Sequence, residues 1–461
     1  MRRRRRELVR RVGGVVLAAT GMAAWMGGHP CFASEGEPPP PIKIQYNNGF
    51  KFTSGDGTFS LRLYAALQGR FTVTDFDQRV AGNQEDVANF FIRRARLWWD
   101  GHAFSPKFTY YFHLQLEPTS AVNLHDAWVQ YAFSEAFKVG VGRNKIPYGA
   151  EFLASAFALN FIDRSIMYGE TDISAGSGSI WPGGGTAPLL LSGENPNTGF
   201  PTGGLSLFRS QGVSLSGRKP LGKDPVVAWE VGVWNGRNSR GLSNPDSKLL
   251  TAARLSFFPL GSFDISTQGD LEGERRWRLA ALASWYRDGG RHLRDATGQQ
   301  VEPYQTRDSG TNLALLARGA GASLDLEWGV ERYLMRRAEP GQWQFEREGW
   351  RASLGYFVVP RRLEVVARSA RLERLRHPSR EAALRSGLGL ARIEHNGMII
   401  TAVEEFLREA TLGLNLYFGH GYQHKVFVDA SHLQRAFLDE GQGRPAPQRD
   451  RRLRSMLQFR F

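Results

Sequence analysis

Arginines two positions apart on an alternating segment are the side chains of this sequence best suited to binding anions. In FIRRARLWWDGHAF, residues 91–104, a period of two places Arg94 and Arg96 on one face with Asp100, and Arg93 on the other. A guanidinium stays charged at physiological pH and pairs with phosphate or carboxylate through two parallel hydrogen bonds. The spacing therefore predicts a strand with one polar, anion-attracting face.

The last segment of the sequence, RRLRSMLQFRF, has the same alternation. One face is mostly apolar and ends in Phe461, whereas the other is mostly cationic and holds Arg452, Arg454 and Arg460. Because chain ends fray unless something holds them, the final aromatic residue favours a strand that lies at a membrane interface. A half-buried strand of a soluble sandwich would alternate in the same way.

Further basic residues fall on alternating segments elsewhere in the chain. These residues are Lys138, Arg351, Arg362 and Arg368. Together with Arg94, Arg96 and the cationic face of the last segment, they would line a water-filled pore and raise the local concentration of anions. Selectivity would then come from an electric field rather than from a single tight site.

The elements that must position these side chains are short strands separated by Gly, Pro, Asn and Asp. In one of them, Leu326, Trp328 and Val330 alternate with Asp325 and Glu327. About 16 such segments follow one another, an even number suited to a closed barrel. Three of them are weaker, at 262–269, 311–319 and 398–407.

This pattern predicts an all-β fold, a 16-stranded antiparallel transmembrane β-barrel whose apolar faces point outward and whose polar faces point into a wet lumen. After the first 33 residues, no stretch of about 18 uninterrupted apolar residues could form a membrane-spanning helix. Soluble antiparallel sandwiches or a propeller also alternate. The sequence lacks the repeat period of a propeller and the Cys and Trp signature of sandwich domains.

The N-terminal region reads as an export signal. MRRRRRELVRR is followed by a small and apolar run, and small residues near Ala33 form a cleavage site, so residues 1–33 are predicted to be a signal peptide. A membrane anchor or a lipid anchor at Cys31 is the alternative. Cleavage would remove the one cysteine, and with it any disulfide or thiolate metal site, and would lower the formal net charge from +14 to +8. A flexible segment, residues 34–48, then leads into the barrel, residues 49–461.

One connection is far longer than an ordinary hairpin loop. Residues 148–204 join two predicted strands, and their first half is rich in aromatic and aliphatic residues. A loop of this length either extends outside the barrel or folds into the lumen and narrows it. We favour infolding, because large apolar side chains such as Phe152, Phe157 and Phe161 would be poorly placed in water.

Several segments together resemble the phosphate-selective porin O/P family. They are GFKFTSGDGTFSLRLYAALQGRF (49–71), FIRRARLWWDG (91–101), NLHDAWVQYAF (123–133), VGVGRNKIPYGAEFLASAFALNFIDRS (139–165), FRSQGVSLSG (208–217) and TLGLNLYFGHGYQHKVFVDASH (411–432). The resemblance implies a trimeric 16-stranded outer-membrane barrel whose third extracellular loop folds inward. It also implies that Arg93 and Arg94 belong to a basic ladder along the pore.

The loop departs from the pattern of the phosphate-specific members. Those members place lysines shortly after the glutamate that corresponds to Glu151, whereas this sequence has Phe152 and Phe157 there. The candidate residues of the constriction loop are Glu151, Phe152, Ser155, Phe157 and Arg164. Acidic residues outnumber Arg164 across the loop, so we predict a preference for anions rather than specific binding of phosphate.

The sequence therefore predicts an outer-membrane porin for passive diffusion of small anions, with phosphate or polyphosphate among them, without enzymatic activity, cofactor or metal. Its expected partners are small anions, the lipid of the outer membrane and two further copies of itself, and no nucleic acid. Three alternatives remain open. They are a general diffusion porin without anion specificity, an outer-membrane β-barrel enzyme, and a secreted β-rich protein that binds acidic partners.

Overall fold

The computed structural model describes most of the chain after the predicted signal peptide. The described residues are 41–46, 48–75, 86–116, 122–168, 207, 209–236, 248–294, 300–336, 342–376, 390–395, 398–419, 421–438 and 447–461. The predicted signal peptide (1–33), most of the segment 34–48 and the second half of the predicted loop lie outside these ranges. No helix in the described part of the chain is long and apolar enough to cross a membrane.

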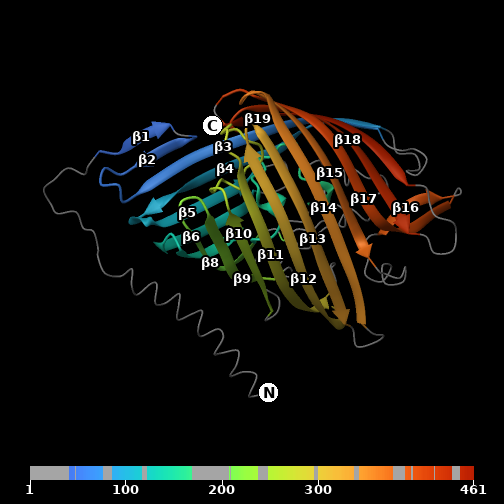
Figure 1. Cartoon of the computed structure of the whole chain (residues 1–461). Helices are drawn as coiled ribbons and strands as arrows, with labels where there is room; N and C mark the ends of the chain where they lie inside the picture. Colours follow the sequence, from blue (N-terminus) through green and yellow to red (C-terminus); the bar gives the residue numbers. More distant parts are fainter. Residues whose placement is uncertain are drawn as a thin grey trace, which may run out of the picture.

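One sheet of long antiparallel strands closes on itself (Figure 1). Its strands along the first half of the ring are β3 (Ser60–Asp75), β4 (Val87–Ala103), β5 (Ser105–Gln115), β6 (Asn123–Ser134), β7 (Phe137–Lys145), β8 (Arg209–Pro220), β9 (Val226–Asn235) and β10 (Leu249–Phe258). The second half holds β11 (Arg278–Arg294), β12 (Gln300–Gly319), β13 (Ala322–Arg336), β14 (Gln342–Val359), β15 (Leu363–Arg376), β17 (Met398–Tyr417), β18 (Lys425–Leu438) and β19 (Gln448–Arg460).

Closure depends on the pairing of the last strand with the first strand of the ring. Arg451 to Arg460 of β19 pair antiparallel with Ala66 to Asp75 of β3. Of the 19 strands described, β1 (Lys43–Tyr46) and β2 (Phe50–Thr53) form a hairpin before β3, and β16 (Leu390–His395) pairs with β17 alone. The ring therefore has 16 strands, which confirms the predicted barrel.

Side chains alternate around this ring as the sequence pattern indicates. In β13, Asp325 and Glu327 are buried inside, whereas Leu326 and Trp328 are 39% and 37% exposed on the outside. In β19, Arg454 is buried, and the outward Leu453 is exposed. A pleated strand points successive side chains to opposite faces, so one strand supplies both the apolar belt and the polar interior.

The connections differ in length between the two ends of the barrel. Most turns at one end are short, such as 135–136, 320–321 and 360–362, and the connections at the other end are longer. In outer-membrane barrels the short turns face the periplasm and the longer loops face the outside. This assigns the end that carries the connection between β7 and β8 to the extracellular side.

One turn at the periplasmic end is an exception to its short neighbours. Residues 259–277 connect β10 to β11 without forming a strand, so the prediction of a strand at 262–269 is wrong. Gln268 and Asp270 are only 3% and 2% exposed, because this turn folds back into the barrel. The other two weak segments are confirmed as strands, 311–319 within β12 and 398–407 within β17.

Candidate functional site

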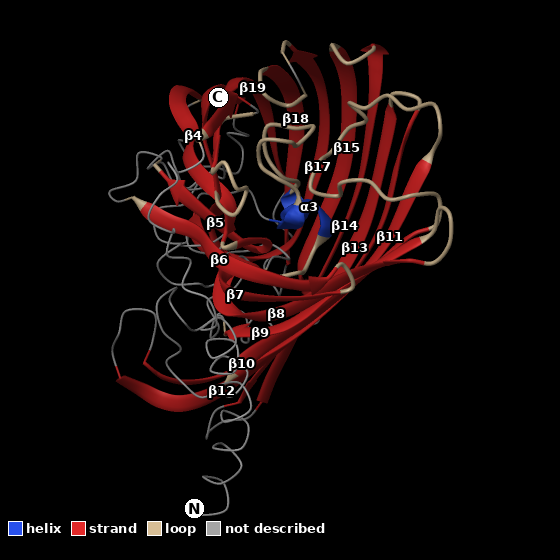
Figure 2. Cartoon of the chain, turned by 90° about the vertical axis from the view of Figure 1, so that its left-hand side faces the viewer, coloured by secondary structure: helices blue, strands red, loops and turns tan. Residues whose placement is uncertain are grey.

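The constriction loop lies inside the barrel over its described part, residues 148–168. It contains the one-turn helix α3 (Ala150–Leu153) and the 3-10 turn η1 (Ile166–Tyr168), and Figure 2 shows α3 in the lumen. Phe152 packs with η1 against Leu372 and Leu407 of the wall. Burial of such side chains removes apolar surface from water, which explains why an aromatic loop folds inward. The rest of the predicted loop is outside the described residues.

Both ends of helix α3 are held by charged side chains. Glu327 of β13 accepts hydrogen bonds from the backbone N–H groups of Ala150 (2.6 Å) and Glu151 (3.1 Å). At the other end, Lys145 donates to the carbonyl oxygens of Phe152, Leu153 and Ala154 at 2.9–3.0 Å. An acid at the N-terminus and a base at the C-terminus satisfy the unpaired backbone groups and match the helix dipole.

Arg164 completes the support of this helix from within the loop. Its guanidinium donates to the carbonyl oxygens of Glu151 (3.1 Å) and Ala154 (2.7 Å) and lies 5.1 Å from the ring centre of Phe152. Both Lys145 and Arg164 are thus engaged with backbone oxygens. Arg164 therefore stabilises the loop conformation instead of pointing its charge into open water.

Glu151 connects the loop to arginines of strands β14 and β15. One of its oxygens accepts hydrogen bonds from the backbone N–H and the hydroxyl of Ser165 at 3.0 and 2.6 Å. The carboxylate also lies 3.6 Å from Arg351 and 3.5 Å from Arg368. Arg351 and Arg368 bind acids of the wall as well, Glu327 at 2.7 Å and Glu409 at 2.5 Å respectively. These two arginines are fully engaged in ion pairs at the loop.

Asp163 is the loop residue around which arginines of the barrel wall gather. Four guanidinium groups surround its carboxylate, those of Arg70 at 2.5 Å, Arg93 at 2.8 Å, Arg94 at 2.9 Å and Arg454 at 3.1 Å. Burial by itself raises the pKa of Asp163, but the nearby arginines outweigh burial and hold this pKa well below its ordinary value. Asp163 is therefore an anion, and its surroundings carry a surplus of positive charge.

Arg93 faces the lumen, which corrects the prediction from strict alternation. In the pairing of β3 with β4, Gln68 is opposite Arg94 and Gly69 is opposite Ile92, so Arg93 is an extra residue in the ladder. Such a β-bulge shifts the phase of the strand and turns two consecutive side chains to one side. Arg93 is 6% exposed and Arg94 is 3% exposed. Strict alternation of side chains along a strand cannot predict an inserted residue.

The constriction loop meets the inward periplasmic turn inside the barrel. Ser155 donates its backbone N–H to the carbonyl of Ser266 at 2.7 Å, and Gln268 donates its backbone N–H to the carbonyl of Ala158 at 2.8 Å. The side-chain oxygen of Gln268 accepts from the backbone N–H of Asn160 at 2.9 Å. Segments from opposite ends of the barrel thus brace each other and narrow the lumen together.

The wall beside this contact is packed too closely for an added methyl group. A Cβ at Gly355 would lie 2.6 Å from the hydroxyl of Ser323 and 2.7 Å from Glu364 Oε1. We expect Gly355→Ala to lower the free energy of unfolding by about 1–3 kcal/mol, because packed neighbours must shift. Urea unfolding of the protein in detergent measures this loss. In the control Gly69→Ala, the new Cβ meets nothing within 4 Å, and a loss as large as that of Gly355→Ala would refute the steric explanation.

Charge is distributed unequally around the inner surface. We call β19 together with β3 to β8 the basic wall, and its inward bases in the described residues include Arg62, Arg70, Arg93, Arg94, Arg96, Lys138, Lys145, Arg209, Arg452, Arg454 and Arg460. The inward acids of the same strands, within the described ranges, are Asp100, Asp126 and Asp450. The basic wall therefore carries a clear excess of positive charge.

The remaining strands, β9 to β18, form a mixed wall. Its inward acids are Glu230, Asp288, Asp308, Asp325, Glu327, Glu331, Glu364, Glu409 and Asp429. Its inward bases are Arg254, Arg278, Arg318, Arg347, Arg351, Arg368 and Lys425. Most of these charges are paired across neighbouring strands, for example Arg318 with Asp325 at 2.5 Å. An electric field therefore points across the lumen from the basic wall to the mixed wall.

Most of the predicted cationic residues point into the lumen. Arg94, Arg454 and Arg452 are buried inside the basic wall, and Arg96 is half-buried there beside His113 at 3.5 Å. Arg460 lies 4.8 Å from the ring centre of Tyr64 near the periplasmic end. Lys138 shares the inward face of β7 near the same end, since the buried Gly140 has the same parity.

Arg362 is the exception among the predicted pore-lining residues. It lies in the exposed turn 360–362 between β14 and β15, where its carbonyl accepts from the backbone N–H of Tyr417 at 2.8 Å. Its place on the inner wall was predicted from the segment 362–372, whose first residue belongs to the turn. Arg362 therefore does not line the constriction.

The aromatic residues of the loop are buried as predicted. Phe157 is 4% exposed and contacts Trp98 edge-on, with 5.1 Å between the ring centres. Ser155 is half-buried, and its hydroxyl accepts from the backbone N–H of Phe157 at 3.3 Å. Phe152 and Phe157 are apolar anchors inside the barrel, and they give the loop no positive charge at these positions.

Several residues at the constriction escaped the sequence-based prediction. Asp163 joins the arginines, Glu327 caps helix α3, and Lys425 donates to the carbonyl of Leu159 at 2.8 Å. Arg70 was recognisable in principle, because it has the inward parity of Gln68 in β3. The loop contacts of these residues were not recognisable, since the contacting residues lie between 69 and 291 positions apart in the sequence.

The geometry describes a narrowed, charged passage through the barrel. Within the described ranges, no group of three or more His, Cys, Asp or Glu is placed to hold a metal ion. A closed barrel with an apolar outer belt, a charged interior and an infolded loop is the architecture of an outer-membrane porin.

Comparison with known proteins agrees with that class. Residues 63–192 match the family model of phosphate-selective porins O and P, which confirms the family resemblance over these residues. None of the curated proteins matches the sequence.

Solved structures with a similar chain path come from several bacteria. The anion-selective porin from Comamonas acidovorans is 9% identical, with 87% of this chain and 100% of that chain covered at a TM-score of 0.49. The outer membrane channel DcaP of Acinetobacter baumannii is 11% identical, with 89% and 99% covered at a TM-score of 0.48. OmpT, an outer membrane protein of Vibrio cholerae, is 8% identical, with 88% and 98% covered at a TM-score of 0.46.

Proposed function

We propose that this protein is an outer-membrane porin through which small anions diffuse passively. The observation that carries the proposal is the excess of inward-facing bases on the basic wall, which faces a mixed wall of paired charges. A low-dielectric wall with one sign of charge focuses the field and concentrates ions of the opposite sign. Anions therefore enter and pass along the basic wall more easily than cations.

The constriction loop determines where along the pore anions are selected over cations. The four arginines around Asp163 and the half-buried Arg96 belong to the same wall, so the field is strongest where the lumen is narrowest. Arg351 pairs with Glu327 and Arg368 pairs with Glu409, and both arginines also lie near Glu151 of the loop. They therefore stabilise the constriction. Conduction by this mechanism needs no tightly bound ion, because each passing anion exchanges between several weakly attracting guanidinium groups.

The same arrangement favours a preference for anions over strict phosphate specificity. Phe152 and Phe157 supply no positive charge, and Lys145 and Arg164 donate to backbone oxygens of the loop. The bases nearest to these rings are thus engaged before any solute arrives. We expect phosphate to block chloride current weakly and only at concentrations comparable with those of the competing salt.

The decisive measurement is the reversal potential of the protein in a planar bilayer under a potassium chloride gradient. The wild type is expected to be anion-selective, and Arg96→Gln is expected to lower the chloride-to-potassium permeability ratio about fivefold, because one unit charge at close range contributes about 1 kcal/mol in water. The matched control Arg332→Gln removes an outward arginine paired with Glu346 and should leave the ratio unchanged. Cation selectivity of the wild type would overturn the proposal.

The family resemblance supports a trimer, and the basic and apolar runs at the N-terminus support export with cleavage of a signal peptide. We propose that three copies form the functional unit and that residues 1–33 are removed during export to the outer membrane. Mass determination of the detergent-solubilised protein and sequencing of its N-terminus test these two points. A monomeric mass would contradict the trimer without affecting the permeation mechanism, and an intact Met1 would contradict cleavage.

A further inference from the structure

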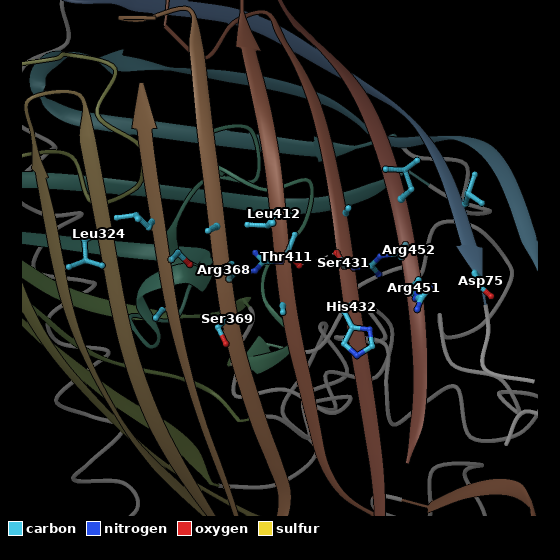
Figure 3. A pocket seen from close by; sticks show the side chains of 18 residues that line it. Asp75, Leu324, Arg368, Ser369, Thr411, Leu412, Ser431, His432, Arg451 and Arg452 are labelled. Atoms are coloured by element: carbon cyan, nitrogen blue, oxygen red, sulfur yellow. Dashed lines mark hydrogen bonds between the residues drawn. The ribbon is translucent and has the colours of Figure 1, made fainter. Parts of the chain in front are cut away.

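The outward face of β14 to β19 is hollowed by a shallow groove of about 870 Å³. Its floor consists of small side chains on neighbouring strands, namely Ala352, Ala367, Ala410 and Ala430, and Leu354, Leu412 and Leu453 stand beside them. Figure 3 shows Leu412 on one strand of this wall and His432 and Arg451 on the strands beyond it. In a membrane this groove faces lipid, so something apolar must fill it.

Strand register places the polar edge of the groove. Ala410 of β17 is opposite His432 of β18, His432 is opposite Arg451 of β19, and Arg451 is opposite Asp75 of β3. Residues opposite each other on adjacent strands have their Cβ atoms about 4.5–5.5 Å apart. The small floor of the groove therefore runs directly into a basic pair formed by His432 and Arg451, both exposed.

One step closer to the extracellular end, the outward face becomes more basic still. Arg371 of β15 is opposite Arg408 of β17, and Arg408 is opposite Gln434, which is opposite Arg449 of β19. Arg371 forms an ion pair with Glu373 at 2.6 Å, and Arg408 lies 4.4 Å from the ring centre of Phe406. Along each strand, apolar side chains thus give way to cationic ones at the upper edge of the groove.

We propose that this surface binds a phosphorylated, multiply acylated lipid of the outer leaflet. One acyl chain lies on the alanine floor, and the phosphate of the head group pairs with Arg408, His432 and Arg451. Arginine binds phosphate through paired hydrogen bonds, and basic residues at the membrane surface attract anionic head groups. The extracellular end of the barrel meets the outer leaflet, which places the cationic edge at head-group depth.

A second copy of this chain that packs through this same face is a weaker candidate for the groove. Asp75 and Glu373 are the outward acids described beside its cationic edge, and Glu373 already pairs with Arg371. Such a copy would bring more arginines than acidic residues to this edge, and the positive charges of Arg408 and Arg451 would not be neutralised. An anionic lipid supplies the missing charge and a chain of suitable width at the same time.

Native mass spectrometry of the full-length protein in detergent tests this inference. The protein is titrated with a diphosphorylated, six-chain glucosamine disaccharide lipid, and in parallel with the same lipid after removal of both phosphates. We expect the phosphorylated lipid to bind as a discrete adduct and the dephosphorylated lipid to bind much more weakly. The double variant Arg408→Gln/Arg451→Gln should weaken binding about 30-fold, as expected for two basic residues at a membrane surface.

A second variant and a charge-matched control separate specific binding from general attraction. Ala410→Leu/Ala430→Leu fills the groove, keeps every charge and should also lower occupancy by the phosphorylated lipid. Arg287→Gln/Arg307→Gln removes two exposed outward arginines on β11 and β12, away from the groove, and should leave occupancy unchanged. Equal binding of both lipids, or equal loss in the control, would overturn the proposal.

If the groove-filling variant changes the oligomeric mass and leaves lipid occupancy intact, a second copy occupies the surface and the lipid proposal is wrong. The inference rests on the membrane placement of the barrel but not on its anion selectivity. Reversal potentials of the same variants keep the two questions apart, because outward substitutions should alter lipid binding and leave permeation unchanged.

Discussion

Asp163→Asn is expected to lower the free energy of unfolding by about 3–5 kcal/mol, because removal of one partner leaves buried charges uncompensated. Four guanidinium groups lie within 3.1 Å of this carboxylate, and Asp429 stays paired with one of them, Arg454, at 2.7 Å. Urea unfolding in detergent measures the loss. The matched control Asp100→Asn removes the partner of the more exposed Arg62 and should cost about 1 kcal/mol or less.

The pH dependence of this difference identifies its cause. The pKa of Asp163 is depressed in the folded protein, so its contribution to stability is complete above the pKa of the unfolded state, begins to decline below that value and is lost as the pH falls through the lower pKa of the folded state. The gap between wild type and Asp163→Asn should therefore be full at pH 7 and shrink below about pH 4. A gap that is independent of pH would indicate that packing, and not charge, fixes the loop.

The same variant has a consequence for permeation. Without the carboxylate of Asp163, the four arginines around it lose a shared anionic partner at the constriction. We expect phosphate to block chloride current at a lower concentration in Asp163→Asn than in the wild type, since guanidinium groups bind phosphate through paired hydrogen bonds. An unchanged blocking concentration would mean that the loop has moved and that the arginines no longer converge.

Glu327→Gln is expected to release the constriction loop. Glu327 accepts hydrogen bonds from the backbone N–H groups of Ala150 and Glu151, from Asn312 at 2.9 Å, from Arg351 at 2.7 Å and from the hydroxyl of Tyr168. The amide of glutamine carries no negative charge to pair with Arg351. Its NH2 group also replaces one of the two carboxylate oxygens that accept hydrogen bonds. The expected loss of stability is about 3–5 kcal/mol.

Single-channel conductance provides the functional readout for this variant. If the loop leaves its place in the lumen, conductance rises and anion selectivity falls, because the narrow region beside the basic wall widens. The control Glu348→Gln lies on the outer face, where its carboxylate accepts from the indole N–H of Trp328 at 2.8 Å, and it should keep the conductance of the wild type. Reduced conductance in Glu327→Gln would contradict the view that Glu327 holds the loop in position.

Much of the barrel was predictable from the sequence alone. The alternation of Asp325, Leu326, Glu327 and Trp328 predicted both faces of β13, because the side-chain period of a strand is two. The parity of Arg452 and Arg454 placed them in the lumen for the same reason. The apolar loop residues Phe152 and Phe157 predicted infolding, since water is a poor surrounding for such side chains.

Other features depended on pairing between distant segments. The bulge at Arg93 exists because β3 and β4 pair with a shift at Gly69, and nothing in the spacing of IRRARL reports that shift. The segment 262–269 alternates well enough to suggest a strand, yet it forms an inward turn because the loop at Ser155 and Ala158 offers it backbone partners. Local pattern gives the face of a side chain only where the partner strand keeps its register.

The sequence by itself determined the closed barrel, the direction of most side chains and the basic character of the interior, because these follow from a period of two and from composition. Only the tertiary structure decided that Arg351, Arg368 and Arg454 are engaged with acids of the wall and loop, and that Asp163 gathers the arginines of the basic wall. The physical reason is that a charge acts through its distance to other charges. Those distances are set when loop and wall meet inside the barrel.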